Sequence, residues 1–127
     1  MNKEMRTYDL EERVIKFAVA IIDVADEIPV SRAGNHIASQ LIRAGTSPAS
    51  NYGETESAES RSDFVHKMKV ALKELKETRI WLRVLLLKSY FSHRDRIECA
   101  LTECNELVRI FGKSISQRHP TKRKSAN

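Results

Sequence analysis

Four histidines are the first residues to consider for metal chemistry. They are spread along the chain, at His36, His66, His93 and His119. No two of them lie four residues apart, and none is preceded by a glutamate in a Glu-x-x-His pair, the arrangement that carboxylate metal sites in helix bundles use. The sequence therefore predicts neither a metal site nor a cofactor.

Ser47 is the strongest candidate for a nucleophile, since Asn51 and Glu54 follow it at helical spacing. A nucleophilic serine needs an adjacent base, and no histidine shares this face. The chain also lacks a Gly-x-Ser-x-Gly motif and a glycine-rich phosphate loop, because its four glycines are scattered. We expect a protein without a catalytic centre, and not an enzyme.

A row of polar side chains runs along the second predicted helix. Steps of three, four, four and three residues separate its members, which are Gln40, Arg43, Ser47, Asn51 and Glu54. Glu74 and Glu77 on the next helix, with Lys73 beside them, are expected to meet Arg43 and Glu54 across an antiparallel pair. One interpretation of this polar row is a network that sets helix register, because buried polar groups must be paired. The other is a polar contact used in subunit assembly or ligand binding.

Positive charges recur along one face of the third predicted helix. Steps of four, three and seven residues separate the members of this basic row, which are Lys69, Lys73, Lys76 and Arg83. Lys69 and Lys73 are like charges at i and i+4, as are Arg79 and Arg83, and such pairs destabilise a helix. Positive charge kept at that cost indicates an anionic partner such as nucleic acid. The alternative is an ordinary solvated face, since Lys73 also has Glu77 within reach.

Residues 118–127 are predicted to form a disordered basic tail that adds nonspecific attraction to phosphate. They hold no acid, and four of the five net positive charges belong to them, on Arg118, Lys122, Arg123 and Lys124. Residues 1–117, which are nearly neutral, are predicted to form the folded bundle.

Apolar residues recur at steps of three and four in four segments, which predicts four amphipathic helices. The first, third and fourth stripes are well filled, for example by Phe17, Leu75 and Phe111. The second is thin. We expect an all-α fold, an antiparallel up-and-down four-helix bundle, because short loops favour antiparallel neighbours.

Capping residues and prolines predict the ends of the first two helices. Asp9 is a capping-box start for the first helix, and Pro29 ends it. The second helix runs from near Ser31 toward Ser57 and is kinked or divided at Pro48.

Two further serines are the expected caps of the last two helices. Ser62 caps the third helix and Ser92 the fourth. His119 and Pro120 are expected to end regular structure.

The two cysteines, Cys99 and Cys104, lie about 140° apart around one helix and are not expected to bridge each other. Cys104 falls on the apolar stripe, as a small core residue does. No apolar stretch approaches the roughly 20 residues of a membrane span, and the polar N-terminus lacks the apolar core of a signal peptide. A cytoplasmic location is predicted.

Several segments together resemble a known family. They are residues 7–13 with Phe17 and Ala18, residues 40–43 with Thr46, Ser47 and Asn51, then Asp63 and Phe64, and residues 71–74 with Glu77, Thr78, Trp81 and Leu82. Their order and spacing resemble the four-helix-bundle proteins encoded by intervening sequences of bacterial large-subunit ribosomal RNA genes. That family is similar to the accessory variability determinant of diversity-generating retroelements. The resemblance covers residues 8–85, whereas the fourth helix matches only as a generic amphipathic helix.

The resemblance implies an up-and-down bundle that assembles into a ring, commonly a pentamer with a central channel. It also implies a non-enzymatic role, with binding to nucleic acid or to a partner of the reverse-transcriptase type through basic surfaces. The polar row matches family positions, which favours a structural or assembly role for it. The basic row follows no strict family motif.

The leading hypothesis is an oligomeric accessory protein that binds RNA or DNA through phosphate contacts from the basic row and the basic tail. The alternative is a protein-interaction scaffold that engages a protein partner such as a reverse transcriptase. An enzyme acting on phosphorylated small molecules is disfavoured, because no base accompanies a nucleophile.

Overall fold

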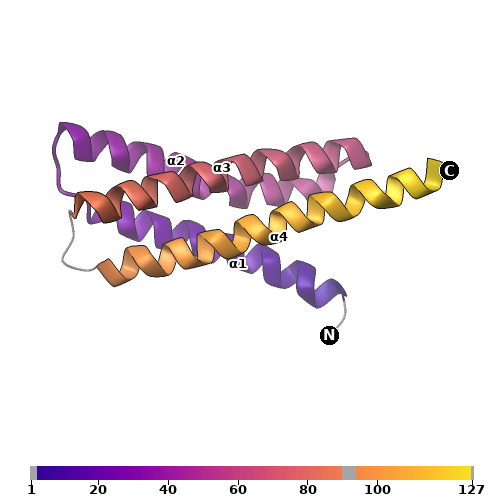
Figure 1. Cartoon of the computed structure of the whole chain (residues 1–127), viewed down its shortest axis with the longest axis horizontal. Helices are drawn as coiled ribbons and strands as arrows, with labels where there is room; N and C mark the ends of the chain where they lie inside the picture. Colours follow the sequence, from indigo (N-terminus) through magenta and orange to yellow (C-terminus); the bar gives the residue numbers. More distant parts are fainter. Residues whose placement is uncertain (1–2, 90–93, 127) are drawn as a thin grey trace.

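Four α-helices make up nearly all of the chain. The computed structural model describes the backbone of residues 3–89 and 94–126 and the side chains of residues 9–89 and 94–116. The helices are α1 (Lys3–Asp26), α2 (Arg32–Glu54), α3 (Arg61–Lys88) and α4 (Arg94–Ala126), and a 3₁₀ turn, η1 (Thr55–Ser57), follows α2. They lie side by side along the long axis of the molecule (Figure 1). The described backbone contains no strand, which confirms the all-α class and the four packed helices.

The helices touch mainly their neighbours in sequence order. α1 packs on α2, α2 on α3 and α3 on α4, whereas α1 and α4 meet less extensively. Across the diagonals the described backbones stay farther apart, although side chains still meet in the core, where the rings of Tyr52 on α2 and Phe111 on α4 lie edge-on with centroids 5.9 Å apart. The four helices therefore surround one core, with α1 and α3 at diagonal corners.

The predicted apolar stripes supply that core. Fully buried members come from every helix, among them Val14, Ile21, Leu41, Leu75, Leu82, Cys104 and Phe111. On α4, Ala100 and Leu107 are buried, while Leu101 and Val108 are half-buried. Thr78 is the polar member of the α3 stripe, and its hydroxyl donates to the carbonyl of Glu74 at 2.8 Å. Its burial therefore leaves no unpaired polar group.

Glycine lets α2 approach α1 closely at one point. A Cβ added at Gly45 would lie 2.5 Å from Cγ2 of Ile21 and within 2.9 Å of two more carbons of that side chain. Ile21 is fully buried and has no room to move away. The absent side chain at Gly45 therefore sets the distance between α1 and α2 at mid-length.

Gly45→Ala is expected to lower the free energy of unfolding by about 1 to 3 kcal/mol, because the new methyl group overpacks Ile21. Gly53→Ala is the matched control on the same helix, since a Cβ there meets nothing within 4 Å. The control is expected to raise stability by up to about 1 kcal/mol through helix propensity. Urea denaturation followed by circular dichroism measures both, and equal effects of the two variants would contradict the close-contact explanation.

Serine caps begin two of the helices. The predicted start of α2 near Ser31 is confirmed, and Ser31 is its cap, because the amide of Gly34 donates to Oγ of Ser31 at 2.9 Å. On α3 the prediction of Ser62 was wrong by two residues. Ser60 is the cap, since its Oγ accepts from the amide of Asp63 at 3.0 Å, while the carboxylate of Asp63 accepts from the amide of Glu59. Two reciprocal contacts close this turn, which explains why the helix begins earlier.

Helix α1 also begins earlier than predicted. It starts at Lys3, so Asp9 is an exposed residue inside the helix and not its cap. An exposed aspartate costs an α-helix only a fraction of a kcal/mol, about 0.7 or less, so a capping-type pair does not force a start there. Ser92, the predicted cap of α4, lies outside the described residues.

Neither Pro48 nor Pro120 ends the helix that contains it. Helix α2 continues through Pro48, which is buried, so the helix is not divided there. Helix α4 runs to Ala126, so the expected end of regular structure at Pro120 is wrong. A proline removes one hydrogen bond and crowds the preceding turn, which penalises a helix without forbidding it. The boundary between a bundle and a tail at residue 118 stays a prediction.

Candidate functional site

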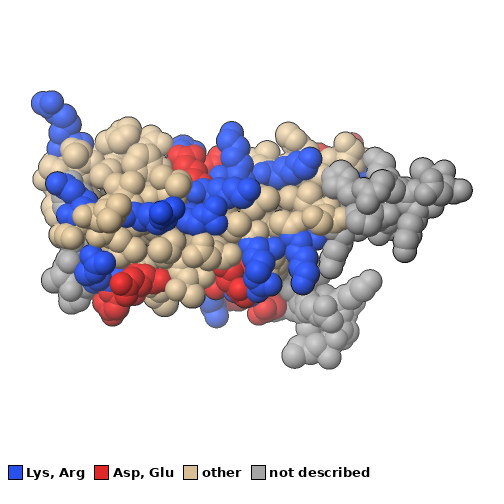
Figure 2. Space-filling view, in the orientation of Figure 1, with Lys and Arg blue, Asp and Glu red and all other residues tan. Residues whose placement is uncertain are grey.

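The basic row lies on the outward side of α3. Lys69, Lys73, Lys76 and Arg83 are all exposed, and the first and last are about 21 Å apart at the usual helical rise. Figure 2 shows Lys and Arg side chains along the middle of the molecule, where Figure 1 places α3, with acidic side chains nearer the edges of this face. The helix thus presents a continuous line of positive charge.

No ion pair neutralises this line among the described residues. Other cations of the bundle do have partners: Arg13 pairs with Glu103 at 2.8 Å, and Lys67 with Asp63 at 3.4 Å and Glu54 at 3.6 Å. None of the recorded ion pairs involves a residue of the basic row. Glu77, the acid within reach of Lys73 on the sequence, is bound to Arg43 instead. The positive charge of the basic row therefore remains available to a ligand.

Arg79 extends the basic row toward α4, and the sequence-based set omitted it. It is half-buried, and its positive charge acts on the thiol of Cys104, partly opposing a rise in that pKa. Its spacing was visible in the sequence, three residues after Lys76 and four before Arg83. Because apolar residues surround Arg79 in the sequence, it was not assigned to the basic row.

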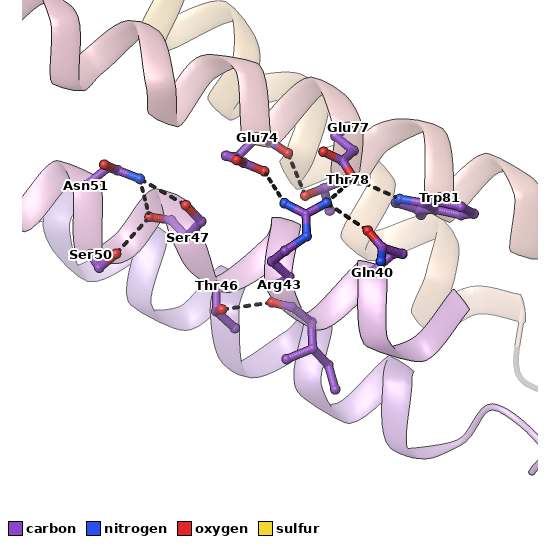
Figure 3. A network of polar contacts seen from close by, with 11 residues as sticks. Gln40, Arg43, Thr46, Ser47, Ser50, Asn51, Glu74, Glu77, Thr78 and Trp81 are labelled. Carbon is purple, nitrogen blue, oxygen red and sulfur yellow. Dashed lines mark hydrogen bonds and ion pairs between the residues drawn. The ribbon is translucent and has the colours of Figure 1, made fainter. Parts of the chain in front are cut away.

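Arg43 is the centre of the polar contacts between α2 and α3 (Figure 3). Its Nη1 donates to Glu74 Oε1 at 3.1 Å, and its Nη2 donates to Glu77 Oε2 and, at 2.9 Å, to Gln40 Oε1. The Arg43 side chain is 48% exposed, while those of Glu74 and Glu77 are 15% and 33% exposed. One guanidinium therefore joins two helices through charge-assisted hydrogen bonds.

The rest of the polar row is divided into smaller groups. The side-chain amide of Asn51 donates to Oγ of Ser47 at 2.9 Å and to the Ser47 carbonyl at 3.1 Å, a contact within α2. Glu54 pairs with Lys67, not with Lys73. The structure thus brings four of the seven predicted polar residues into one network, namely Gln40, Arg43, Glu74 and Glu77.

Trp81 belongs to this network, although the predicted polar contacts did not include it. Its Nε1 donates to Glu77 Oε2 at 3.2 Å, and its ring meets that of His36 edge-on, with centroids 6.0 Å apart. The signal was its position four residues after Glu77, where side chains on a helix are neighbours. Glu77 therefore accepts from both α2 and its own helix.

Replacing Arg43 with Met is expected to lower the free energy of unfolding by about 1 to 2 kcal/mol, because Glu74 and Glu77 lose their donor while Arg43 itself is half solvated. Urea denaturation measures the change. Arg83→Met, which removes an exposed cation without a recorded partner, is the control and is expected to stay within about 0.5 kcal/mol. Equal losses in the two variants would rule out a special role for the Arg43 contacts.

The two cysteines differ in environment. Cys104 is fully buried, its Sγ donates to the carbonyl of Leu75 at 3.2 Å, and burial raises its pKa to about 12. Cys99 is exposed, and both thiols are free. The thiolate is the reactive form, so Cys104 is protected twice, by its neighbours and by protonation.

A Cys99→Ser variant is expected to show no reaction of its remaining thiol with Ellman's reagent at pH 8, and one thiol per chain after unfolding in guanidinium. The pKa of about 12 leaves roughly one part in ten thousand of Cys104 as thiolate at that pH. The Cys104→Ala variant reports on Cys99 alone. Rapid reaction of Cys99→Ser in native buffer would contradict the buried placement.

The predicted basic tail has four cations whose side chains lie outside the described residues: Arg118, Lys122, Arg123 and Lys124.

In the part of the chain that is described, no three His, Cys, Asp or Glu side chains gather as a metal site would need. The described residues also include no helix long and apolar enough to cross a membrane.

Comparison with known proteins identifies the family. The family model for 23S rRNA-intervening sequence protein matches residues 6–113. The chain belongs to this family. The resemblance drawn from residues 8–85 is thereby confirmed, and the match extends into α4.

A solved structure supports the same assignment. It is a protein with unknown function from the S23 ribosomal protein family of Bacteroides thetaiotaomicron, with 29% sequence identity and a TM-score of 0.78. The alignment covers 87% of this chain and 97% of that chain. Among curated proteins no match was found. Membership of the 23S rRNA-intervening sequence family thus defines the fold, and the chemistry must be argued from the surface.

Proposed function

We propose that this member of the 23S rRNA-intervening sequence family is a non-enzymatic, oligomeric accessory protein that binds nucleic acid through phosphate contacts. The observation that carries the proposal is the basic row with Arg79, a line of cations on α3 without an ion pair in the described structure. Both cysteines are free, which suits a reducing compartment, so we place the protein in the cytoplasm.

Lysine is the main chemical group of this surface, and it favours phosphate over bases. An ammonium is a point charge without the planar fork that reads a base edge. Between Lys69 and Arg83 the exposed apolar side chain is Ile80, which is aliphatic, 52% exposed and offers no ring on which a base would stack. The exposed imidazole of His66 lies one turn before Lys69, at the end of the row. The proposed binding therefore depends on charge and shows little preference for sequence, in RNA or DNA.

The proposal includes the antiparallel, up-and-down order of the helices and their assembly into a ring, with a pentamer favoured. Short connections support the antiparallel order, since only residues 27–31 separate α1 from α2. Glu27, just after α1, pairs with Arg96 in the first turn of α4, which supports opposite directions for these two helices.

Reversing three charges of the basic row, in the variant Lys69→Glu, Lys73→Glu and Lys76→Glu, is expected to weaken binding to RNA or DNA by at least about tenfold in 50 mM salt. The slope of log affinity against log salt is expected to fall in magnitude by about 2 to 3, because each phosphate contact contributes about 0.7 to 0.9. Filter binding with a duplex and a single strand, across a salt series, measures both.

A variant with the same change in net charge is the control for the basic row. Arg32→Glu, Arg61→Glu and Lys113→Glu alter exposed cations at the starts of α2 and α3 and on α4. Equal loss in the two triple variants would show that net charge, not this surface, binds the polymer. Absence of affinity below tens of micromolar, together with capture of an acidic protein after nuclease treatment, would favour the scaffold hypothesis, in which Ile80 and the 88% exposed Leu87 contact a protein partner such as a reverse transcriptase.

A further inference from the structure

Two aromatic rings meet at the boundary between α2 and α3. The ring of His36 on α2 lies edge-on to that of Trp81 on α3, with centroids 6.0 Å apart and planes at 76°. His36 is exposed and Trp81 is half-buried, so both side chains keep surface in contact with water. Trp81 is the only tryptophan in the sequence, and it lies at this boundary instead of among the fully buried core residues. We call His36 and Trp81 the aromatic pair.

The polar network beside the aromatic pair fixes the position of the indole. Nε1 of Trp81 donates to Oε2 of Glu77 at 3.2 Å, and the same carboxylate oxygen accepts from Arg43 (Figure 3). A side chain that is already held in place loses little conformational freedom when a ligand packs on it. The indole is therefore preorganised to receive a flat ring.

The charges around the aromatic pair suit an uncharged ring that belongs to an anionic ligand. Residues 28–53, which include all of α2 except Glu54, and residues 78–89 of α3 contain no Asp or Glu. The nearby carboxylates of Glu74 and Glu77 are both bound to Arg43. Two acids with one cation do not attract a phosphate, so a phosphate of the ligand must be held elsewhere.

Lysines on α3 supply that contact on both sides of the pair. Lys73, Glu77 and Trp81 follow one another at steps of four, so Lys73 of the basic row lies on the same ridge of the helix as the indole. Lys88 follows Trp81 by seven residues, and both lysines are exposed. At the usual helical rise they lie about 12 and 10 Å from Trp81 along the helix axis. A strand that crosses the pair can thus bring its phosphates to both lysines.

The other recess of the described surface suits a polyanion less well. It is a groove of about 550 Å³ between α1 and α4, lined by Asp23 and Glu103 as well as by Arg13, Lys16 and Arg96. Glu103 neutralises Arg13, and Asp23 is exposed without a recorded ion pair. The boundary between α2 and α3, which also adjoins the basic row, is therefore the better site.

We propose that the aromatic pair binds an unpaired nucleobase, so that the protein prefers single-stranded nucleic acid to a duplex. The inference rests on the proposed function and adds the form of its ligand. In a duplex the base faces are stacked on one another, and the phosphates alone would contact α3. In a single strand each base presents a flat face, and its stacking on an aromatic side chain tolerates any sequence.

The single tryptophan gives a direct test, because the tryptophan fluorescence of the native chain comes from Trp81 alone. A ten-nucleotide thymidine strand, titrated into the full chain in 50 mM salt and excited beyond the absorption of tyrosine, is expected to quench this fluorescence. An abasic strand of the same length, which carries the phosphates without the bases, is expected to leave it unchanged, as is a duplex. Filter binding of the same polymers measures their affinities.

Trp81→Leu is expected to weaken binding of the thymidine strand by about 5- to 150-fold, the loss that corresponds to one stacked base, and to leave binding of the duplex unchanged. Trp81→Phe is the matched control, since it also loses the N–H that binds Glu77 but keeps a ring. It is expected to retain most of the affinity for the strand. Circular dichroism checks that both variants keep the helix content of the native chain.

The outcomes separate this inference from the proposed function. Equal affinity for strand and duplex, or quenching by the abasic strand, overturns the inference and leaves phosphate binding by the basic row standing. Failure of every polymer to bind overturns both. Equal quenching by thymidine monophosphate at the same nucleotide concentration would make a free nucleotide the ligand, and quenching by polyglutamate would make it an acidic protein. Either result overturns the preference for a single strand.

Discussion

The contacts of Arg43 with two glutamates of α3 organise much of this structure. Helix α2 has a thin apolar face, so apolar burial alone leaves the register of α2 against α3 weakly specified. The guanidinium of Arg43 sets the register of α2 against α3, because its donors reach Glu74, Glu77 and Gln40 at once. These contacts also occupy the carboxylate that Lys73 would otherwise share. One arginine thereby joins two helices and leaves the basic row of α3 without an ion pair in the described structure.

The consequence is a separation of charge across the bundle. Helix α1 carries Glu12 and Asp26 on its outer surface, and α3, at the diagonal corner, carries the basic row. Like charges one turn apart weaken α3 by a few tenths of a kcal/mol per pair, on the order of 0.2 to 0.5. The well-filled core beneath that helix, from Met68 to Leu85, offsets this cost easily. The inner side of α3 thus maintains the fold, and the residues on its outer side can serve to bind a ligand.

The fold was predictable because it depends on periodicity, which the sequence displays directly. Val14, Leu75 and Phe111 lie on stripes whose spacing alone predicts burial. Helix ends were less predictable: both Ser60 and Ser62 are adequate caps, and the reciprocal contact with Asp63 decides between them. The close approach at Gly45 and the groove between α1 and α4 depend on distances between helices. No spacing within one helix reveals such distances.

The candidate site was predictable only where it depends on spacing within one helix. The basic row follows from spacing within one helix, whereas its lack of acidic partners depends on where Arg43 directs its guanidinium. The expected pairing of Glu54 with Lys73 was wrong, because Lys67 lies on the side of α3 that faces α2 and reaches Glu54 first. Trp81 was not among the predicted polar contacts, because its side chain is mostly apolar, although its indole N–H donates to Glu77.

Assembly into a ring would raise the affinity of a short basic row for nucleic acid. Four or five cations on one helix hold a phosphate backbone only weakly at physiological salt, since each contact is screened within about 8 Å. In the proposed ring the same row recurs on every copy. Once one row is bound, the next engages a polymer already at high effective concentration, so avidity grows without any new kind of contact. The affinity of the basic row for a polymer therefore depends on the proposed self-association of the chain.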